Sequence, residues 1–330
     1  MRLEDCNLNV NQTVGAPLTR TSPEPSWVNA RESGVLPTAA FELYELARYL
    51  SFGSAPLFLS DVDNVLFSYF GIVLESVRDS LVEANEHRVS FEEASSLTYD
   101  LGKKIRGEPW DRDAPLRARR EFRYFLLSEL AALDAVADLT AILLTGTVPN
   151  LRVGRAQFSR IENWLQQAQA VGPAVLSPRE HFARELHGAL RTLVQSPEPE
   201  REWLPLLRLY RNKGAHLGSS VFRQIGLHDN AATFYTFLPR EWPYIWERHM
   251  KPAGQHTGPS VADLFRQTLI HQDVITYVLG VQRKVNAVSS AALGQLALAY
   301  RHLQDLPFNH EALAELDASS ERYAFDHFPA

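Results

Sequence analysis

Residues 60–81, SDVDNVLFSYFGIVLESVRDSL, carry the pattern that decides the fold class. Ser60 has the hydroxyl typical of a helix N-cap, and Asp63 follows at the third helical position, where a carboxylate completes the capping pattern. Apolar residues then recur every three or four positions and share one helix face: Leu66, Phe70, Val73, Leu74, Val77 and Leu81. The stretch therefore predicts an amphipathic helix that buries one side.

Helical spacing continues on both sides of this segment. Residues 38–50 repeat it, and Ser90 with Glu93 three residues later predicts the start of a shorter, separate helix that ends near Gly102. Ser177 and Glu180 form a second capping pattern, with proline between them at the first helical position. Further helices are predicted over 116–144, 155–170, 200–217 and 260–303, the last with possible breaks at Gly280 and Gly294.

The pattern changes after Gly218. Residues 222–227 and 233–238 are predicted to form two short strands around the polar turn 228–230. We therefore expect a mainly α protein, a helical bundle with one β-hairpin insertion and a C-terminal long-helix extension. The expected divisions are a flexible N-terminal arm over 1–38, the bundle over 39–218, the hairpin with an aromatic connector over 219–255, and a helical region packed on the bundle over 256–330.

The composition narrows the function classes. The chain has 330 residues and a net charge of −6, so any nucleic-acid contact must come from a local basic patch. Cys6 is the one cysteine in the sequence, which excludes an intramolecular disulfide framework and a cysteine-based zinc cluster. With no apolar run long enough for a signal peptide or a membrane span, the sequence predicts a cytoplasmic protein.

Residues 204–216, LPLLRLYRNKGAH, are the most informative for chemistry. On a helix, one set of side chains falls within roughly 100° of arc and predicts a buried stripe: Trp203, Leu206, Leu207, Tyr210, Gly214 and Leu217. Arg208, Asn212 and His216 fall on the other side, and Arg211 lies at the edge between the two. The stripe therefore predicts that the polar residues face away from the core.

The polar residues on that side suit phosphodiester chemistry. Asn212 and His216 are four residues apart, so Asn212 could orient the imidazole. Arg211 can bind a phosphate through its planar guanidinium, and a histidine can exchange a proton near neutral pH. Arg211 and His216 are a minimal set for cleaving a phosphodiester without a metal ion. The simpler interpretation is a solvated helix face.

Arg211, Asn212 and His216 also resemble the signature of the HEPN superfamily. In that signature a polar residue directly follows an arginine, and four residues separate the arginine from a histidine. The resemblance extends over about residues 39–218. It implies a metal-independent endoribonuclease without a cofactor, in which the motifs of two protomers meet in one cleft. The chain differs from that family in continuing for more than 100 residues past the motif.

The resemblance also implies roles and partners. His216 would be the general acid or base, Arg211 would hold the scissile phosphate, and Asn212 would orient the imidazole. RNA would be the substrate of a homodimer, in a defence, toxin–antitoxin or RNA-processing setting, with an antitoxin or other regulatory protein as a further partner and no membrane. The alternative is a HEPN-like regulatory subunit that binds RNA or protein without cutting.

A second basic segment lies at 103–123, with eight Lys and Arg against four Asp and Glu, a surplus of +4. It is a candidate phosphate-binding patch, with Trp110 and Phe122 available for base stacking. The alternative is a solvated loop and helix start with internal ion pairs. The predicted substrate-binding residues are Lys103, Lys104, Arg119, Arg120, Arg208 and Lys213. The spacing of the histidines and carboxylates predicts no metal site.

Overall fold

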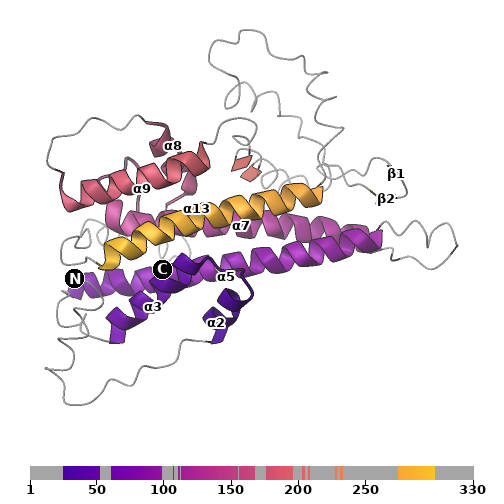
Figure 1. Cartoon of the computed structure of the whole chain (residues 1–330), viewed down its shortest axis with the longest axis horizontal. Coiled ribbons are helices and arrows are strands. Elements are labelled where there is room, and N and C mark those ends of the chain that lie inside the picture. Colours follow the sequence, from indigo (N-terminus) through magenta and orange to yellow (C-terminus); the bar gives the residue numbers. More distant parts are fainter. Residues whose placement is uncertain are drawn as a thin grey trace, which may run out of the picture. The chain divides into compact units, whose positions relative to one another are not determined.

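The computed structural model describes residues 25–52, 61–98, 107, 111, 113–154, 156–167, 176–195, 203–204, 207–208, 227–228, 231–232 and 274–301. Within these residues the protein is mainly α, with seven helices (Figure 1). They are α2 Pro25–Glu32, α3 Thr38–Phe52, α5 Asp61–Thr98, α7 Ala114–Leu144, α8 Phe158–Gln166, α9 Pro178–Val194 and α13 Val274–Arg301.

The chain divides into two compact units. The first comprises Met1–Leu81, Ala131–Val194 and Asn286–Ala330, and the second comprises Val82–Leu130 and Gln195–Val285. Helices α5, α7 and α13 each contribute residues to both units.

Part of the predicted N-terminal arm is instead a packed helix. The prediction of a flexible segment over 1–38 does not hold for α2, because Trp27 is fully buried. The Trp27 ring stacks on Tyr44 of α3 with centroids 4.2 Å apart, and the Arg78 guanidinium of α5 lies 5.1 Å from the same ring. Gly34, with φ of 71°, closes the turn that ends α2. A single aromatic anchor was too weak a pattern to indicate this helix.

One predicted helix start and two predicted helix breaks are also wrong. Helix α5 continues to Thr98, so Ser90 lies inside it and does not cap a new helix. Residues 82–90 contain neither glycine nor proline, so nothing in the backbone forces a break there. Helix α13 likewise passes through Gly280 and Gly294 without interruption.

The capping pattern before α9 is confirmed. The Glu180 carboxylate accepts hydrogen bonds from the Ser177 backbone N–H and hydroxyl, both at 2.8 Å. The Glu180 backbone N–H donates to the Ser177 hydroxyl at 3.3 Å. These bonds hold the pKa of Glu180 below its usual value. Helix α9 therefore begins where the sequence predicts.

A short antiparallel ladder lies at the predicted polar turn. Strand β1, Leu227–His228, pairs with β2, Ala231–Ala232, in the register Leu227↔Ala232 and His228↔Ala231. Leu227 is the one residue of the predicted strands 222–227 and 233–238 that the structure describes, and the other residues of those strands lie outside the described part of the chain.

The core of the first unit surrounds the end of α7, where every residue from 136 to 144 is buried. Asp138 lies in this stretch and accepts hydrogen bonds from the Tyr69 hydroxyl of α5 at 2.5 Å and the Gly154 N–H at 2.7 Å. One turn earlier, Asp134 accepts the Phe158 N–H at 2.8 Å, at the first residue of α8. The two aspartates therefore tie α5 and the segment that leads into α8 to the buried helix.

The second unit contains a buried carboxyl group. Glu129 of α7 is fully buried, and neither of its carboxyl oxygens has a hydrogen-bond partner among the residues that the structure describes. Burial raises the pKa of Glu129 to about 8, because an ionised carboxylate is poorly stabilised away from water. Glu129 is thus held in the core as a neutral acid at neutral pH.

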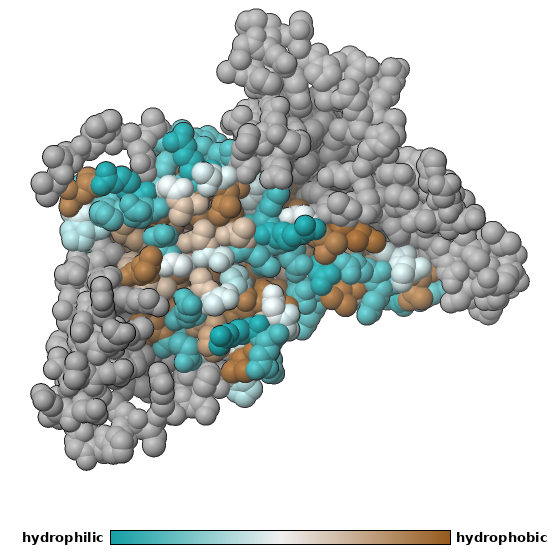
Figure 2. Space-filling model, in the orientation of Figure 1, coloured by the Kyte–Doolittle hydropathy of each residue, from teal (hydrophilic) through white to brown (hydrophobic). Residues whose placement is uncertain are grey.

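Exposed large hydrophobic side chains are scattered over the described residues. On the face drawn in Figure 2, hydrophobic residues are interspersed with hydrophilic ones. Those exposed by more than a third include Val65, Ile72, Val89, Leu97, Leu116, Tyr124 and Leu298. In the described part of the chain, no helix is both long and apolar enough to span a bilayer.

The buried Glu129 makes stability depend on pH. Its pKa is about 8 in the folded state against 4.5 ordinarily, so the folded state binds the proton more tightly than the unfolded state. The free energy of unfolding should therefore fall as the pH rises from about 4.5 towards 8. Glu129→Gln should remove this loss and be more stable than wild type at pH 8 by on the order of a few kcal/mol, with little difference at pH 5.

Urea unfolding followed by circular dichroism at pH 5, 6.5 and 8 measures this effect. Glu93→Gln is the matched control, because Glu93 is an exposed glutamate of the same unit. Equal pH slopes for wild type and Glu129→Gln would contradict the assignment.

Candidate nucleic-acid interface

Six of the predicted site residues lie outside the described part of the chain: Arg211, Asn212, Lys213, His216, Lys103 and Lys104. Their roles and grouping therefore stay predictions. The structure describes the other three, Arg119, Arg120 and Arg208.

Four described residues before the motif, 203–204 and 207–208, are helical, as predicted. Trp203 and Leu207, two members of the predicted stripe, are buried. Leu204 is also buried, although it lies 100° from Trp203 on the helix. Arg208 was placed on the face away from the stripe, and the structure shows it half-buried. The buried face at this point is therefore broader than the predicted stripe.

The first half of α7 presents a row of arginines to solvent. Arg119, Arg120 and Arg123 are exposed, and Arg117 is 41% exposed. Between Ala114 and Tyr124 these four arginines are accompanied by one acidic residue, Glu121. We call Arg119, Arg120, Arg123 and Tyr124 the arginine face. Its three arginines belong to the predicted patch at 103–123, and Tyr124 is the next residue along the chain.

Ion pairs with nearby carboxylates neutralise some arginines of this segment but not Arg119 or Arg123 within the described residues. Arg117 is paired with Asp111 at 2.6 Å, and Arg120 with Glu121 at 2.7 Å. In the described part of the chain, neither Arg119 nor Arg123 is paired with a carboxylate. These two residues are four apart and project from the same side of the helix. The predicted internal ion pairs therefore occur, but they cover only part of the positive charge.

Asp111 fixes the start of α7 in addition to pairing with Arg117. Its carboxylate accepts the backbone N–H groups of Asp113 and Ala114 at 2.9 and 3.1 Å. The bond from the Asp113 N–H, then the bond and charge of Arg117, and last the bond from the Ala114 N–H hold the pKa of Asp111 below its usual value. The negative charge of Asp111 at the N-terminus of α7 also interacts favourably with the positive end of the helix dipole.

The aromatic residue on the arginine face is Tyr124, whereas the sequence predicted that Phe122 would be available for base stacking. Phe122 is 4% exposed and packs on Phe91 of α5 with centroids 5.6 Å apart, so the prediction that it stacks on bases is wrong. Tyr124 is 43% exposed and lies next to Arg123. Trp110 lies outside the described residues.

Behind the arginines lies a cluster that the sequence did not indicate. Glu121 is buried and accepts from Nδ1 of His87 at 2.8 Å through Oε2 and from Nε of Arg120 at 2.8 Å through Oε1. The His87 ring also stacks on Tyr124 at 5.2 Å. Burial alone would raise the pKa of Glu121, but the bonds from His87 and Arg120 outweigh burial and lower it.

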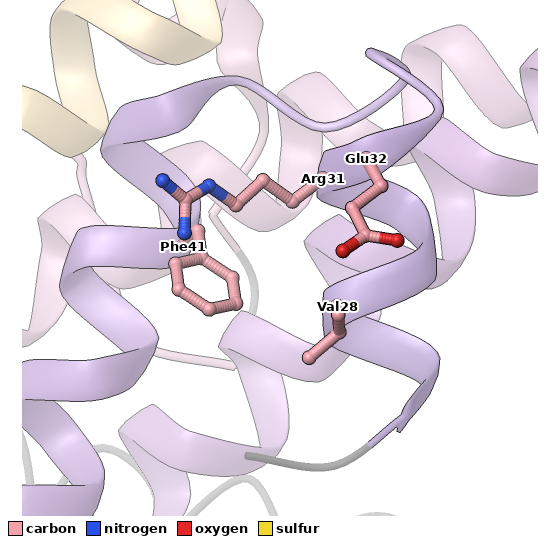
Figure 3. A pocket seen from close by; sticks show the side chains of 4 residues that line it. All are labelled: Val28, Arg31, Glu32 and Phe41. Atoms are coloured by element: carbon pink, nitrogen blue, oxygen red, sulfur yellow. The ribbon is translucent and has the colours of Figure 1, made fainter.

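A pocket of ≈ 540 Å³ lies at α2 and α3, lined by Val28, Arg31, Glu32 and Phe41 (Figure 3). The Arg31 guanidinium lies 4.6 Å from the centre of the Phe41 ring. None of the predicted site residues lines this pocket. Within the described residues, no group of three or more His, Cys, Asp or Glu side chains is placed to hold a metal ion.

Comparison with known proteins assigns no family. No family model, no curated protein and no solved structure matches the chain.

The arginine face should bind single-stranded RNA mainly through phosphates. We expect the double variant Arg119→Ala/Arg123→Ala to weaken RNA binding and to lower the slope of log K against log salt by about 1.4, since each lost phosphate contact on a single strand removes about 0.7. Fluorescence anisotropy with a labelled oligonucleotide between 50 and 200 mM salt (about the range over which such contacts show) measures both effects.

The matched control removes the same charge from α9. Arg184→Ala/Arg191→Ala takes away two exposed helical arginines. An equal loss of affinity in the two double variants would indicate a general charge effect and would contradict a localised face.

Proposed function

We propose that the protein is a HEPN-like, metal-independent endoribonuclease that cleaves RNA to 2′,3′-cyclic phosphate and 5′-hydroxyl ends. The observation that carries the RNA part of the proposal is the arginine face, where Arg119 and Arg123 pair with no carboxylate of the described residues and lie beside exposed Tyr124. Arginine and an exposed aromatic ring suit the phosphates and bases of a single strand. A mainly helical architecture is compatible with the proposed family.

The chemistry in this proposal comes from the sequence motif. His216 acts as general base at the ribose 2′-hydroxyl or as general acid at the leaving 5′-oxygen, and Arg211 stabilises charge on the oxygens of the scissile phosphate. Asn212 orients the imidazole. No step needs a metal ion. Arg208, Lys213, Lys103 and Lys104 extend phosphate binding in the same proposal. The activity suits a defence, toxin–antitoxin or RNA-processing system in which an antitoxin restrains it.

An RNA cleavage gel tests this proposal. The wild type should cleave a single-stranded RNA in the presence of EDTA, and the His216→Ala variant should be slower by a factor of 100 or more, on the order expected for loss of a general acid or base. The end groups are read from resistance of the 3′ end to phosphatase and from labelling of the 5′ end by polynucleotide kinase.

Two results would count against the proposal. Loss of cleavage with EDTA would indicate a metal-dependent mechanism. RNA binding without any cleavage by the wild type would favour the alternative, a HEPN-like regulatory subunit that binds RNA or protein without cutting.

The proposed site is shared between two protomers. Five residues along a helix turn roughly 500°, so the predicted helix would project Arg211 and His216 about 140° apart. One helix therefore holds a phosphate poorly, whereas two copies around a two-fold axis offer two arginines and two histidines. We expect a homodimer by multi-angle light scattering at micromolar concentration, and a fully active monomer would contradict the shared site.

A further inference from the structure

The cluster at His87 has the geometry of an acid–base pair. His87 of α5 and Glu121 of α7 are 34 residues apart in the sequence, yet Nδ1 and Oε2 lie 2.8 Å apart. The Glu121 side chain is 9% exposed, whereas the His87 side chain is 29% exposed. The carboxylate is thus shielded from water, and the imidazole reaches the surface. We propose that His87, oriented by Glu121, is an acid–base group acting on RNA bound along the arginine face.

The hydrogen bond between His87 and Glu121 determines which nitrogen of the imidazole is available to a substrate. The bonds from His87 and Arg120 keep the pKa of Glu121 below its usual value, so its carboxylate is ionised and can only accept hydrogen bonds. The hydrogen between the two groups therefore belongs to Nδ1, and Nε2 of the neutral ring keeps its lone pair. In the described part of the chain, Nε2 is neither buried nor bonded. A proton can therefore be taken up there.

Two neighbours restrict the imidazole and supply charge. The Tyr124 ring stacks on the His87 ring at 5.2 Å with an interplanar angle of 29°. Arg120 is bonded to the other oxygen of Glu121, so its guanidinium and the imidazole are bound to one carboxylate. The bonds to Glu121 use Nε and one terminal nitrogen of Arg120, and this side chain is 59% exposed. Its other N–H groups remain for a phosphate oxygen.

The reaction is a transesterification in which atoms and charge balance. Nε2 of His87 takes the proton of a ribose 2′-hydroxyl, and the 2′-oxygen forms a bond to phosphorus as the bond from phosphorus to the 5′-oxygen breaks. The leaving oxygen takes a proton from a general acid, the role that the proposed function leaves open to His216, and water carries the proton of Nε2 back to that acid. The products are a 2′,3′-cyclic phosphate, a 5′-hydroxyl and the neutral imidazole. Glu121 is a positioning residue, because it acts through His87.

The choice of RNA rests on the proposed function, but the assignment of His87 is separate from the assignment of His216. The test measures single-turnover cleavage of a single-stranded RNA by the full-length protein in EDTA. We expect His87→Ala to be slower by 100-fold or more, with its RNA dissociation constant within about threefold of wild type, and we expect added imidazole to restore part of the rate. Glu121→Gln should also be slower and should change the pH–rate profile.

The control is His181→Ala, which removes an exposed histidine of α9 and should leave the rate unchanged. Unchanged cleavage by His87→Ala, with cleavage abolished in His216→Ala, would overturn this assignment and leave the proposed function standing. A wild type that does not cleave RNA would overturn both. Slow cleavage by His87→Ala without imidazole rescue, together with a lowered melting temperature, would make the pair structural and would also overturn the assignment.

Discussion

The complete burial of the end of α7 is the constraint on which the first unit depends. Every residue from 136 to 144 is buried, and nine residues make two and a half turns, so all sides of the helix are covered. Leu139, Ile142 and Leu143 are fully buried, and each contributes roughly 1.5–3 kcal/mol of hydrophobic stabilisation. The chain on every side of this segment must therefore supply apolar surface or satisfy its polar groups.

Polar groups inside such a helix must find partners in the protein. The Thr140 and Thr145 hydroxyls donate to carbonyls one turn earlier, and Asp138 accepts from Tyr69 and Gly154. Glu129 lies in the other unit and has no such partner among the described residues, and burial keeps it neutral. Asp138 therefore adds specificity to the packing of its unit, whereas the buried carboxyl of Glu129 costs stability whenever the pH favours its ionised form.

Sequence patterns predicted the features that depend on neighbouring residues and missed those that depend on distant ones. The Ser177 cap was confirmed, because its partner lies three residues away. The same motif at Ser90 failed, because a capping pattern does not end a helix that has no breaker before it. Helix α2 was missed, because Trp27 is held by Tyr44 and Arg78 from two other helices, and no local periodicity records those contacts.

The arginine face shows that the rotation of a helix about its own axis determines which of its side chains are exposed. The basic run of α7 was visible in the sequence, but its exposed side is set by the buried residues Ala118, Phe122 and Phe125. Tyr124 lies 200° from Phe122 on the helix, so burying one ring exposes the other. Glu121 lies between the two sides, where it is buried yet meets His87. No sequence spacing could predict that pair, because its geometry requires α5 and α7 to pack in this particular register.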